Sequence, residues 1–408
     1  MRRVVVTGMS GICALGSDWT QVGAGLRARR NAIRTMPEWD CYADMNTRLA
    51  CPIPDFAPPA HWTRKQLRSM GRVSQLVVRS SELALADAAL LGDPIIRSGA
   101  MGVACGSSTG STPDIKNFAE TVIHHDPGYI NANSYVRMMP HTTAANISIF
   151  FGITGRLIPT SSACTSGSQG IGYAYEAIKF GRQKLMLAGG GDELCPTEAM
   201  AFDILYATSR RNDQPATTPR PYDRDRDGLV VGEGAGMFVL EELGHAQQRG
   251  VRIYAEIVGF GSNADGLHVT RPDENAMRRV MELALEDAGI PAQAIGYVNG
   301  HGTATEHGDI AETQATAALF GARMPISSQK SYLGHTLGAC GVLEAWFSIQ
   351  MMREGWFAPT LNLDNIDPRC GELDYVSGEG SALQAEHVMS NNFAFGGVNT
   401  SLIFKRWS

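Results

Sequence analysis

The chain has 408 residues, of which 44% are hydrophobic and 19% charged, a composition typical of a globular protein with room for two domains. Its net charge is −6 with no basic block, which argues against a nucleic-acid-binding protein that relies on charge. No apolar run approaches the roughly 18 residues of a membrane span, and no signal peptide precedes the first strand-like run. We therefore expect a cytoplasmic protein without a membrane-spanning segment.

The cysteines form no recognisable framework. They stand at positions 13, 41, 51, 105, 164, 195, 340 and 370 without a C-x-x-C pair, so neither a zinc ribbon nor a thioredoxin-type site is supported. In a chain without a secretory signal, we expect reduced thiols that pack as small apolar residues. A cysteine with a chemical role needs a special local context.

An internal repeat is the main organisational signal. The segment ELALADA at 82–88 returns as ELALEDA at 282–288, and both copies lie in stretches with the apolar spacing of a helix. A strand-like run precedes each copy and another follows it after a short turn. The shared strand–helix–strand order predicts a duplicated α/β unit. The runs that precede and follow the copies are 3–8, 101–106, 253–259 and 295–300.

Each half then continues with a short strand, a turn of small residues and an amphipathic helix. The strand and turn span 157–167 in the first half and 325–338 in the second, and each following helix has apolar residues at i, i+4 and i+7. Strands that alternate with helices and Gly-rich turns predict a predominantly parallel sheet in each half. We expect the halves to be 1–248 and 249–408, packed together and joined near 244–250.

Three side chains in turns are candidates for chemistry. Cys164 stands where the chain enters the first-half helix, and there the unpaired N–H groups and the helix dipole favour a thiolate. A capped helix start with an incidental cysteine is the alternative. His301 follows a strand between glycines, and His335 lies at the mouth of the second-half helix, at the edge where α/β folds bind ligands. If the halves are pseudo-symmetric, His335 is the positional counterpart of Cys164, and the two form a nucleophile–base pair.

Other motifs carry less weight. Cys340 lies in an apolar stretch, so packing is its expected role. Residues 106–110 fit the G-x-S-x-G elbow of α/β-hydrolases with Ser108 as nucleophile, but residues 111–113 delay the helix that the elbow requires. The sequence contains neither a Walker A motif nor H-E-x-x-H, and it gives no support for NAD, ATP or zinc.

With Cys164, His301 and His335 in place, the chain resembles the elongating β-ketoacyl-acyl-carrier-protein synthases of the thiolase-like superfamily over essentially its whole length. The Gly-His-Thr at 334–336 indicates the Cys-His-His set of elongating enzymes and not the Cys-His-Asn set of initiating ones. The resemblance implies a thiolase-like duplicated α/β fold in five layers, α-β-α-β-α, and a homodimer. The motifs that carry it are VVTG at 5–8, SACTSG at 162–167, DRDG at 225–228, HGT at 301–303, GHT at 334–336 and NNFAFGGVN at 391–399.

The resemblance also implies the chemistry of these residues. Cys164 takes an acyl group from an acyl carrier protein, and malonyl-carrier then loses CO2 to give an enolate that attacks the acyl-enzyme. His301 and His335 stabilise that enolate, with the division of labour between them left open. The N–H groups of Cys164 and Phe395 match the family's oxyanion hole, and Phe395 also matches its gate for the acyl chain.

Further positions match the family's supporting residues. Lys330 and Glu344 match a pair beside the histidines that is either electrostatic or plainly structural. We expect no cofactor and no metal, because both substrates arrive on the phosphopantetheine of the acyl carrier protein. The remaining matches are Thr303 and Thr305 for the pantetheine arm, Thr109, Met138 and Phe202 for the acyl pocket, and Arg64, Lys65, Arg68 and Arg72 for docking of the acidic carrier.

Four positions depart from the usual pattern. Glu306 replaces a common Pro, Ala394 and Val398 replace a Gly and a Thr of the closing motif, and Thr109 stands where long-chain enzymes have bulkier apolar residues. They leave the catalytic groups in place but put the usual substrate in doubt. Housekeeping fatty-acid elongation and a secondary pathway therefore both stay open. The segments closest to the synthases of aryl-polyene pigment clusters are 107–110, 138–143 and 391–395.

Three other functions compete with this interpretation. A non-catalytic partner of the chain-length-factor type would have lost the nucleophile, whereas Cys164 is present. A thiolase acting on coenzyme A thioesters would need a second cysteine near the C-terminal Gly-rich loop, where Phe395 stands. A hydrolase built on Ser108 predicts esterase activity that survives Cys164→Ala.

Overall fold

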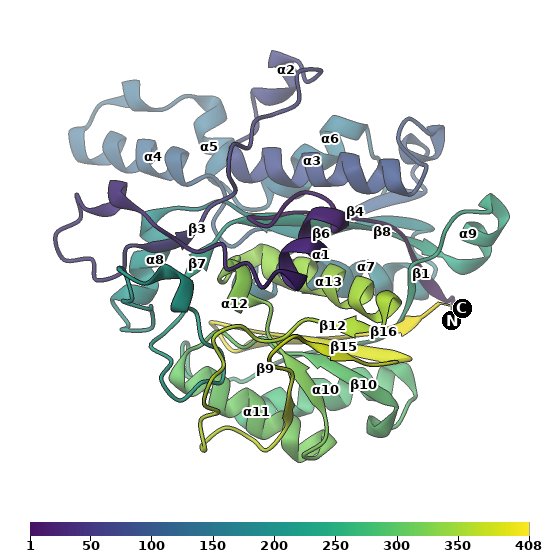
Figure 1. Cartoon of the computed structure of the whole chain (residues 1–408). Helices are drawn as coiled ribbons and strands as arrows, with labels where there is room; N and C mark the ends of the chain where they lie inside the picture. The colour runs from purple at the N-terminus through teal and green to yellow at the C-terminus, as the bar shows by residue number, and fades with distance from the viewer. Residues whose placement is uncertain (408) are drawn as a thin grey trace.

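The structure is a computed structural model and describes residues 1–407. Two layers of β-strands alternate with three layers of helices (Figure 1). Helix α3 (Arg72–Asp87) covers the outer face of the first strand layer and α10 (Glu274–Ala288) that of the second. Between the layers lie α7 (Ser166–Lys179) and α13 (Cys340–Glu354). This arrangement confirms the predicted five-layered α/β fold.

The two strand layers follow one plan, which confirms the duplication. The pairing order is β5-β4-β6-β8-β1 in the first layer and β11-β10-β15-β16-β9 in the second, with β13 (Asp374–Tyr375) added at the edge. The bounds in the first layer are β1 (Val4–Ile12), β4 (Met101–Gly106), β5 (Leu157–Pro159), β6 (Leu185–Asp192) and β8 (Gly234–Glu242). Those in the second are β9 (Ala255–Ala264), β10 (Ile295–Asn299), β11 (Pro325–Ser327), β15 (His387–Ala394) and β16 (Val398–Arg406).

The prediction of a predominantly parallel sheet in each half is only partly right, because the strands of both halves pair in a mixed pattern. Five pairs of the eleven-stranded sheet are parallel: β4 with β5 and with β6, β10 with β11 and with β15, and β11 with β13. Strands β8 and β16 pair antiparallel with both of their neighbours. In the second half the reason is local, because β15 runs into β16 through a short turn, and strands joined by a hairpin must be antiparallel.

The repeated segments pack in the same way in both halves. A Cβ on Gly8 of β1 would lie 2.4 Å from the Ala84 carbonyl oxygen of α3, and one on Gly259 of β9 would lie 2.3 Å from that of Ala284 of α10. Each helix therefore sits directly on a glycine of its first strand. This close approach requires small residues and explains why the repeat is rich in alanine.

The two halves are continuous. Strand β1 pairs antiparallel with β9, Val4–Val6 against Ala255–Ile257, so all eleven strands form one sheet. Helix α9 (Leu243–Arg249) follows the last strand of the first layer and leads to β9, and the boundary between 248 and 249 stays a prediction. Within residues 1–407, no helix combines the length and apolar character needed to cross a bilayer.

The remaining elements surround this framework. The other helices are α1 (Trp19–Arg27), α2 (Arg64–Leu67), α4 (Thr112–His124), α5 (Ala132–Met138), α6 (Thr142–Phe151), α8 (Pro196–Asp203), α11 (Glu306–Phe320) and α12 (Lys330–Leu333). The short strands are β2 (Arg34–Thr35), β3 (Leu49–Cys51), β7 (Val231–Gly232), β12 (Trp356–Phe357) and β14 (Ser381–Ala382).

Candidate active site

Cys164 is presented by a tight turn at the start of α7. A single 3-10 turn, Ala163–Thr165, precedes the helix, and Ala163 takes a left-handed φ of 51°. The turn lies close to the second half, since a Cβ on Gly167 would be 2.8 Å from the carbonyl oxygen of Gly338. Small residues around Cys164 thus allow the two inner helices to meet at the nucleophile.

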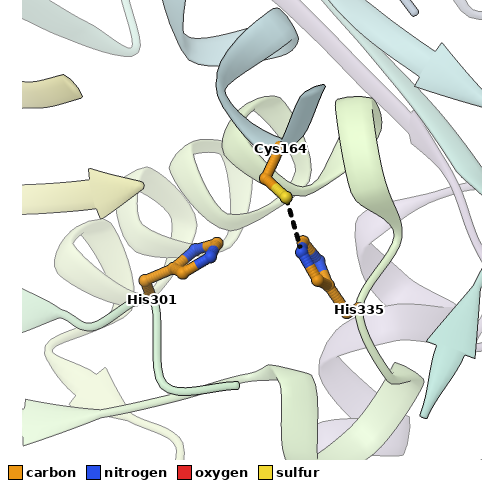
Figure 2. Close-up of side chains that lie close together, drawn as sticks. All are labelled: Cys164, His301 and His335. Atoms are coloured by element: carbon orange, nitrogen blue, oxygen red, sulfur yellow. Dashed lines mark hydrogen bonds between the residues drawn. The ribbon is translucent and has the colours of Figure 1, made fainter. Parts of the chain in front are cut away.

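The three predicted side chains share one buried site (Figure 2). The sulfur of Cys164 lies 3.0 Å from Nε2 of His335. The rings of His301 and His335 lie 5.1 Å apart at 89° to each other. Figure 2 shows Cys164 reaching from the start of α7 toward the two imidazoles. Residues from both halves therefore meet in one place.

His301 is fixed on both sides. Its own N–H and that of Gly302 donate to the Glu312 carboxylate over 2.5 and 2.7 Å. Its ring atom Nδ1 lies 3.2 Å from Nζ of Lys330. Because an ammonium only donates, Nδ1 is the acceptor and the ring proton sits on Nε2. His301 thus offers an N–H donor on the side away from Lys330.

Lys330 and Glu344 form a buried ion pair behind His301. The side chains are 1% and 3% exposed, and Nζ of Lys330 donates to Oε1 of Glu344. Asn392 donates to the other carboxylate oxygen over 3.0 Å. Although burial acts against the charge, Glu344 raises the pKa of Lys330, so it stays an ammonium. The pair therefore contacts the His301 ring directly and is not isolated in the core.

Cys164, His301 and His335 all favour their neutral forms in this site. Burial raises the pKa of the Cys164 thiol to about 12, although Lys330 and the Phe395 N–H act in the opposite direction. Burial and the positive charge of Lys330 hold the pKa of both imidazoles well below the usual value. The predicted thiolate is therefore not the resting form, because desolvation outweighs the helix start. His335 is placed to accept the thiol proton as a substrate arrives.

Two backbone donors converge on the sulfur. The N–H groups of Phe395 and of Cys164 itself both act on it and lower its pKa in part. A carbonyl oxygen on a group attached to this sulfur would lie near the same donors, as an oxyanion hole requires. The Phe395 ring lies 5.1 Å from that of Phe202.

A cavity of about 550 Å³ opens onto the trio. Its lining includes Thr303 and Thr305, whose hydroxyl oxygens lie 2.9 Å apart, and Phe202 and Phe395. Thr109 and Met138 are not part of the lining. Thr109 instead donates to Glu198 over 2.5 Å, and Met138 lies against Gly110 through its backbone.

The four predicted docking residues are not equivalent. Arg64, Lys65 and Arg68 are exposed on and beside α2. Arg72 instead begins α3, where its guanidinium makes a bidentate pair with the buried Glu233 carboxylate at 2.8 and 2.7 Å. Its charge is already compensated, so it is less able than the other three to attract an acidic partner.

Gly338, and not His335, is the counterpart of Cys164. The 3-10 turn Leu337–Ala339 precedes α13 as Ala163–Thr165 precedes α7, and Leu337 has a left-handed φ of 48° like that of Ala163. His335 lies three residues earlier, held by backbone hydrogen bonds to Val230 and Gly232. The predicted symmetry relation is therefore wrong, although the predicted meeting of the two side chains is correct.

Several buried residues of the site were not predicted. Asn392 lies in the NNFAFGGVN motif at 391–399, but the sequence did not indicate a role for it. Glu312 lies nearly two helical turns into α11, and Asp192 ends β6, where it accepts the Gly338 N–H over 2.6 Å. Cys340 packs as expected, but its thiol also donates to the Cys164 carbonyl oxygen over 3.3 Å. Asp192 follows three glycines at a strand end, which is the one signal that could have pointed to it.

Two sets of side chains have the ligand atoms that metal ions prefer. The atoms of Cys164, His301 and His335 lie within 4.8 Å of one another, as do those of His301, Cys340 and Glu344. The adjacent Lys330 ammonium repels a cation at either position. The absence of a metal stays a prediction.

The fold and the site define an enzyme that uses a cysteine nucleophile, a histidine beside it and backbone N–H donors, a combination suited to acyl transfer. Comparison with known proteins narrows this class. The family described as "Beta-ketoacyl synthase, N-terminal domain" matches residues 1–246, and "Beta-ketoacyl synthase, C-terminal domain" matches 254–364. The chain belongs to the β-ketoacyl synthase family.

Relatives match over the full chain. The chain is 37% identical over 413 residues to 3-oxoacyl-[acyl-carrier-protein] synthase 2 of Vibrio cholerae, with 99% of each chain covered. It is 35% identical over 422 residues to synthase 1 of Escherichia coli, with 100% of this chain and 99% of the relative covered.

Solved structures match equally well. A β-ketoacyl synthase from Burkholderia phymatum is 61% identical with a TM-score of 0.99. A type II PKS acyl-carrier protein in complex with its ketosynthase bound to the hexaketide is 27% identical with a TM-score of 0.88. Each comparison covers 100% of both chains.

Proposed function

We propose that the protein is a 3-oxoacyl-acyl-carrier-protein synthase that condenses an acyl group with malonyl-carrier by decarboxylation. The observation that carries this proposal is the contact of the Cys164 sulfur with His335 in a cavity that His301 also lines. The full-length relatives named as such synthases support it.

In the first half-reaction, Cys164 takes the acyl group. Its thiol proton passes to Nε2 of His335 while the sulfur attacks the thioester carbonyl, and the Cys164 and Phe395 N–H groups stabilise the oxyanion. The carbon–sulfur bond to pantetheine then breaks. The leaving thiolate takes the proton from His335, so the products are an acyl-enzyme and a free carrier.

In the second half-reaction, malonyl-carrier loses CO2. The electrons of the broken carbon–carbon bond pass to the thioester oxygen, and the N–H of His301 stabilises the resulting enolate. His335 becomes the second donor once its ring proton has moved from Nδ1 to Nε2, because Nε2 gave its proton to the leaving thiolate in the first half-reaction. The enolate carbon attacks the acyl carbonyl carbon on Cys164, so a new carbon–carbon bond forms and the carbon–sulfur bond breaks. The Cys164 sulfur leaves as a thiolate and takes a proton from solvent. Lys330 holds His301 with its donor nitrogen free for this step.

Both substrates arrive on the phosphopantetheine arm of an acyl carrier protein, and the proposed reaction uses no cofactor and no metal. Thr303 and Thr305 line the cavity where the arm would bind. Phe395 is exposed to 37% on a glycine-flanked turn and would swing aside for the acyl chain. Thr109, Met138 and Phe202 stay candidates for the pocket beyond it. A cytoplasmic location is part of this proposal.

We place carrier docking at Arg64, Lys65 and Arg68, because they are exposed and an acyl carrier protein is acidic. A structure of such a carrier in complex with its ketosynthase supports a direct protein contact. Reversing these charges is expected to raise KM several-fold, more at low salt, with kcat unchanged. Arg182→Glu, beyond the far end of α7, is the matched control; an equal effect of the control would contradict this location.

We also propose a homodimer through β5. This strand ends the eleven-stranded sheet, so one of its edges is unpaired, and Leu157 on it is 41% exposed. An unpaired edge with apolar side chains is a template for pairing with a second copy. Sedimentation of the wild-type protein and of Leu157→Asp tests this: a dimer that the variant weakens is expected, and a wild-type monomer would contradict it.

The experiment that tests the proposed function is intact-mass analysis with acyl-carrier donors. A panel of saturated, polyunsaturated and aromatic acyl groups is mixed with the enzyme, and the adduct is mapped to a peptide. We expect the acyl mass on Cys164. An adduct on any other residue would contradict the proposal, and the relative rates across the panel separate fatty-acid elongation from an aryl-polyene pathway.

A further inference from the structure

One buried carboxyl lies beside the cavity without a part in the proposed reaction. Glu198 and Phe202 are one turn apart on α8, and both face inward with 7% and 8% exposure. Phe202 lines the cavity together with Cys164 and Phe395. The Glu198 carboxyl therefore lies one helical turn behind an aromatic wall of the cavity.

Only one oxygen of this carboxyl has a partner. Thr109 Oγ1 donates to Glu198 Oε1 over 2.5 Å. Oε2 is buried and makes no hydrogen bond with any group in residues 1–407. Because buried polar atoms are nearly always hydrogen-bonded, an orphaned oxygen beside a substrate cavity indicates a partner that arrives with the substrate.

The surroundings of Glu198 disfavour its charged form. Burial and then the carboxyl of Asp192 raise the pKa of Glu198 well above its usual value, and Glu193 acts in the same direction. A protonated carboxyl carries an O–H that donates and a C=O that accepts. Such a group suits a neutral hydroxyl or carbonyl, whereas the neighbouring acids disfavour an anion.

A chain of polar contacts connects Glu198 to the nucleophile turn. The Ser108 hydroxyl lies 3.4 Å from that of Thr109 and donates to Asp192 over 2.7 Å. Asp192 in turn accepts the N–H of Gly338, whose carbonyl oxygen faces Gly167 at the start of α7. The layer directly behind the cavity lining on this side of Cys164 is thus polar, and a hydrocarbon chain would gain nothing from it.

We propose that Glu198, oriented by Thr109, binds a hydroxyl or carbonyl oxygen carried by the acyl chain on Cys164. The enzyme then prefers an oxygen-bearing acyl chain to a saturated one of equal length. This inference rests on the proposed function, in which the acyl chain passes Phe395 toward Phe202. The oxygen of the acyl chain supplies the hydrogen bond that Oε2 of Glu198 lacks. When a saturated chain is bound, Oε2 stays unpaired.

The test compares matched donors on one acyl carrier protein. The donors are octanoyl and two hydroxyoctanoyl groups, with the hydroxyl in mid-chain or at the end, and the readout is the single-turnover acylation rate by intact mass. We expect the wild-type enzyme to favour one of the hydroxyoctanoyl donors by about tenfold, the order of magnitude of one neutral hydrogen bond gained. The ratio of rates is taken within each protein, so a general loss of activity does not change it.

Variants locate the preference. Glu198→Leu is expected to bring the ratio to about one, and Glu198→Gln to keep it, since an amide also donates and accepts. Thr109→Val removes the hydroxyl that orients the carboxyl and is expected to reduce the ratio in part. Thr197→Val is the control, because it removes an exposed hydroxyl from the same helix.

Two results would overturn the inference. One is a wild-type enzyme that acylates as fast or faster with octanoyl than with both hydroxyoctanoyl donors. The other is a Glu198→Leu enzyme with the wild-type ratio. Failure of the proposed function gives a different result, namely no acyl adduct on Cys164 with any of the three donors.

Discussion

The turns that begin α7 and α13 have the same backbone and opposite chemistry. Both are single 3-10 turns opened by a residue with left-handed φ, Ala163 in one half and Leu337 in the other. At the next position the first half has Cys164 and the second has Gly338, whose N–H donates to Asp192. In the proposed reaction the first half thus supplies the nucleophile, and the second supplies the imidazoles and the ammonium that handle protons and charge. The duplicated halves therefore share one backbone geometry at this turn, and they differ in the side chains that the turn carries.

The largest effect is expected from removing the nucleophile. Cys164→Ala should lower acyl transfer by about 10⁴-fold or more, because no other group can take the acyl chain. The fold should be unchanged, since one small side chain is shortened. Acylation followed by intact mass measures this, with Cys41→Ala on the surface as the control. Retained esterase activity in Cys164→Ala would revive the Ser108 alternative.

Substitutions of the two histidines should affect the two half-reactions to different extents. His301→Ala and His335→Ala are each expected to lower condensation by about 10²–10³-fold, as for lost oxyanion donors. Acylation should fall further in His335→Ala, because only His335 contacts the sulfur. Single-turnover rates of both steps measure the difference. Full condensation activity in either variant would remove that residue from the mechanism.

The ion pair of the second half has no counterpart in the first. Glu344→Gln leaves the Lys330 ammonium buried without its carboxylate, so we expect a loss of about 3 kcal/mol in the free energy of unfolding. Glu354→Gln is the control on the same helix, where a partly exposed pair with Arg27 should contribute less than about 1 kcal/mol. Urea unfolding compares them; equal losses would show that burial of the pair is energetically irrelevant.

The contact between the two helix starts should be intolerant of one added methyl group. A Cβ on Gly167 would lie 2.8 Å from the Gly338 carbonyl oxygen, and one on Gly341 would lie 2.8 Å from the Ser168 nitrogen. We expect each Gly→Ala change to destabilise the protein by about 1–3 kcal/mol. Gly23→Ala in α1 is the control, since its Cβ would have ordinary contacts at 3.4 Å. A neutral Gly341→Ala would contradict the close approach.

The smallest effect concerns pH. The folded protein holds the pKa of His301 and His335 well below the usual value, whereas the unfolded chain binds protons near pH 6.5. Below that pH the unfolded state binds more protons, so stability falls as pH falls, by up to about 1.4 kcal/mol per pH unit for each histidine. His301→Asn should show a shallower slope in urea unfolding between pH 5 and 7. An unchanged slope would contradict neutral burial.

The sequence predicted those features that local patterns carry. The repeat at 82–88 and 282–288 predicted the duplicated architecture, and turns rich in small residues indicated Cys164, His301 and His335 as site residues. Strand direction was not predictable, because apolar spacing does not report whether a strand returns by a hairpin or a crossover. The supporting polar residues were also missed, because Asp192, Glu312 and Asn392 act through contacts between segments far apart in the chain.

The most direct measurement of the shared site follows both half-reactions in one sample. Pre-acylated wild-type enzyme is mixed with malonyl-carrier, and the CO2 released is measured together with the acyl mass remaining on Cys164. If the thiol of the first half and the imidazoles of the second act in one pocket, each CO2 released accompanies the loss of one acyl group to the condensation product. Release of CO2 while the acyl group stays in place, or its loss as free acid, would contradict that convergence.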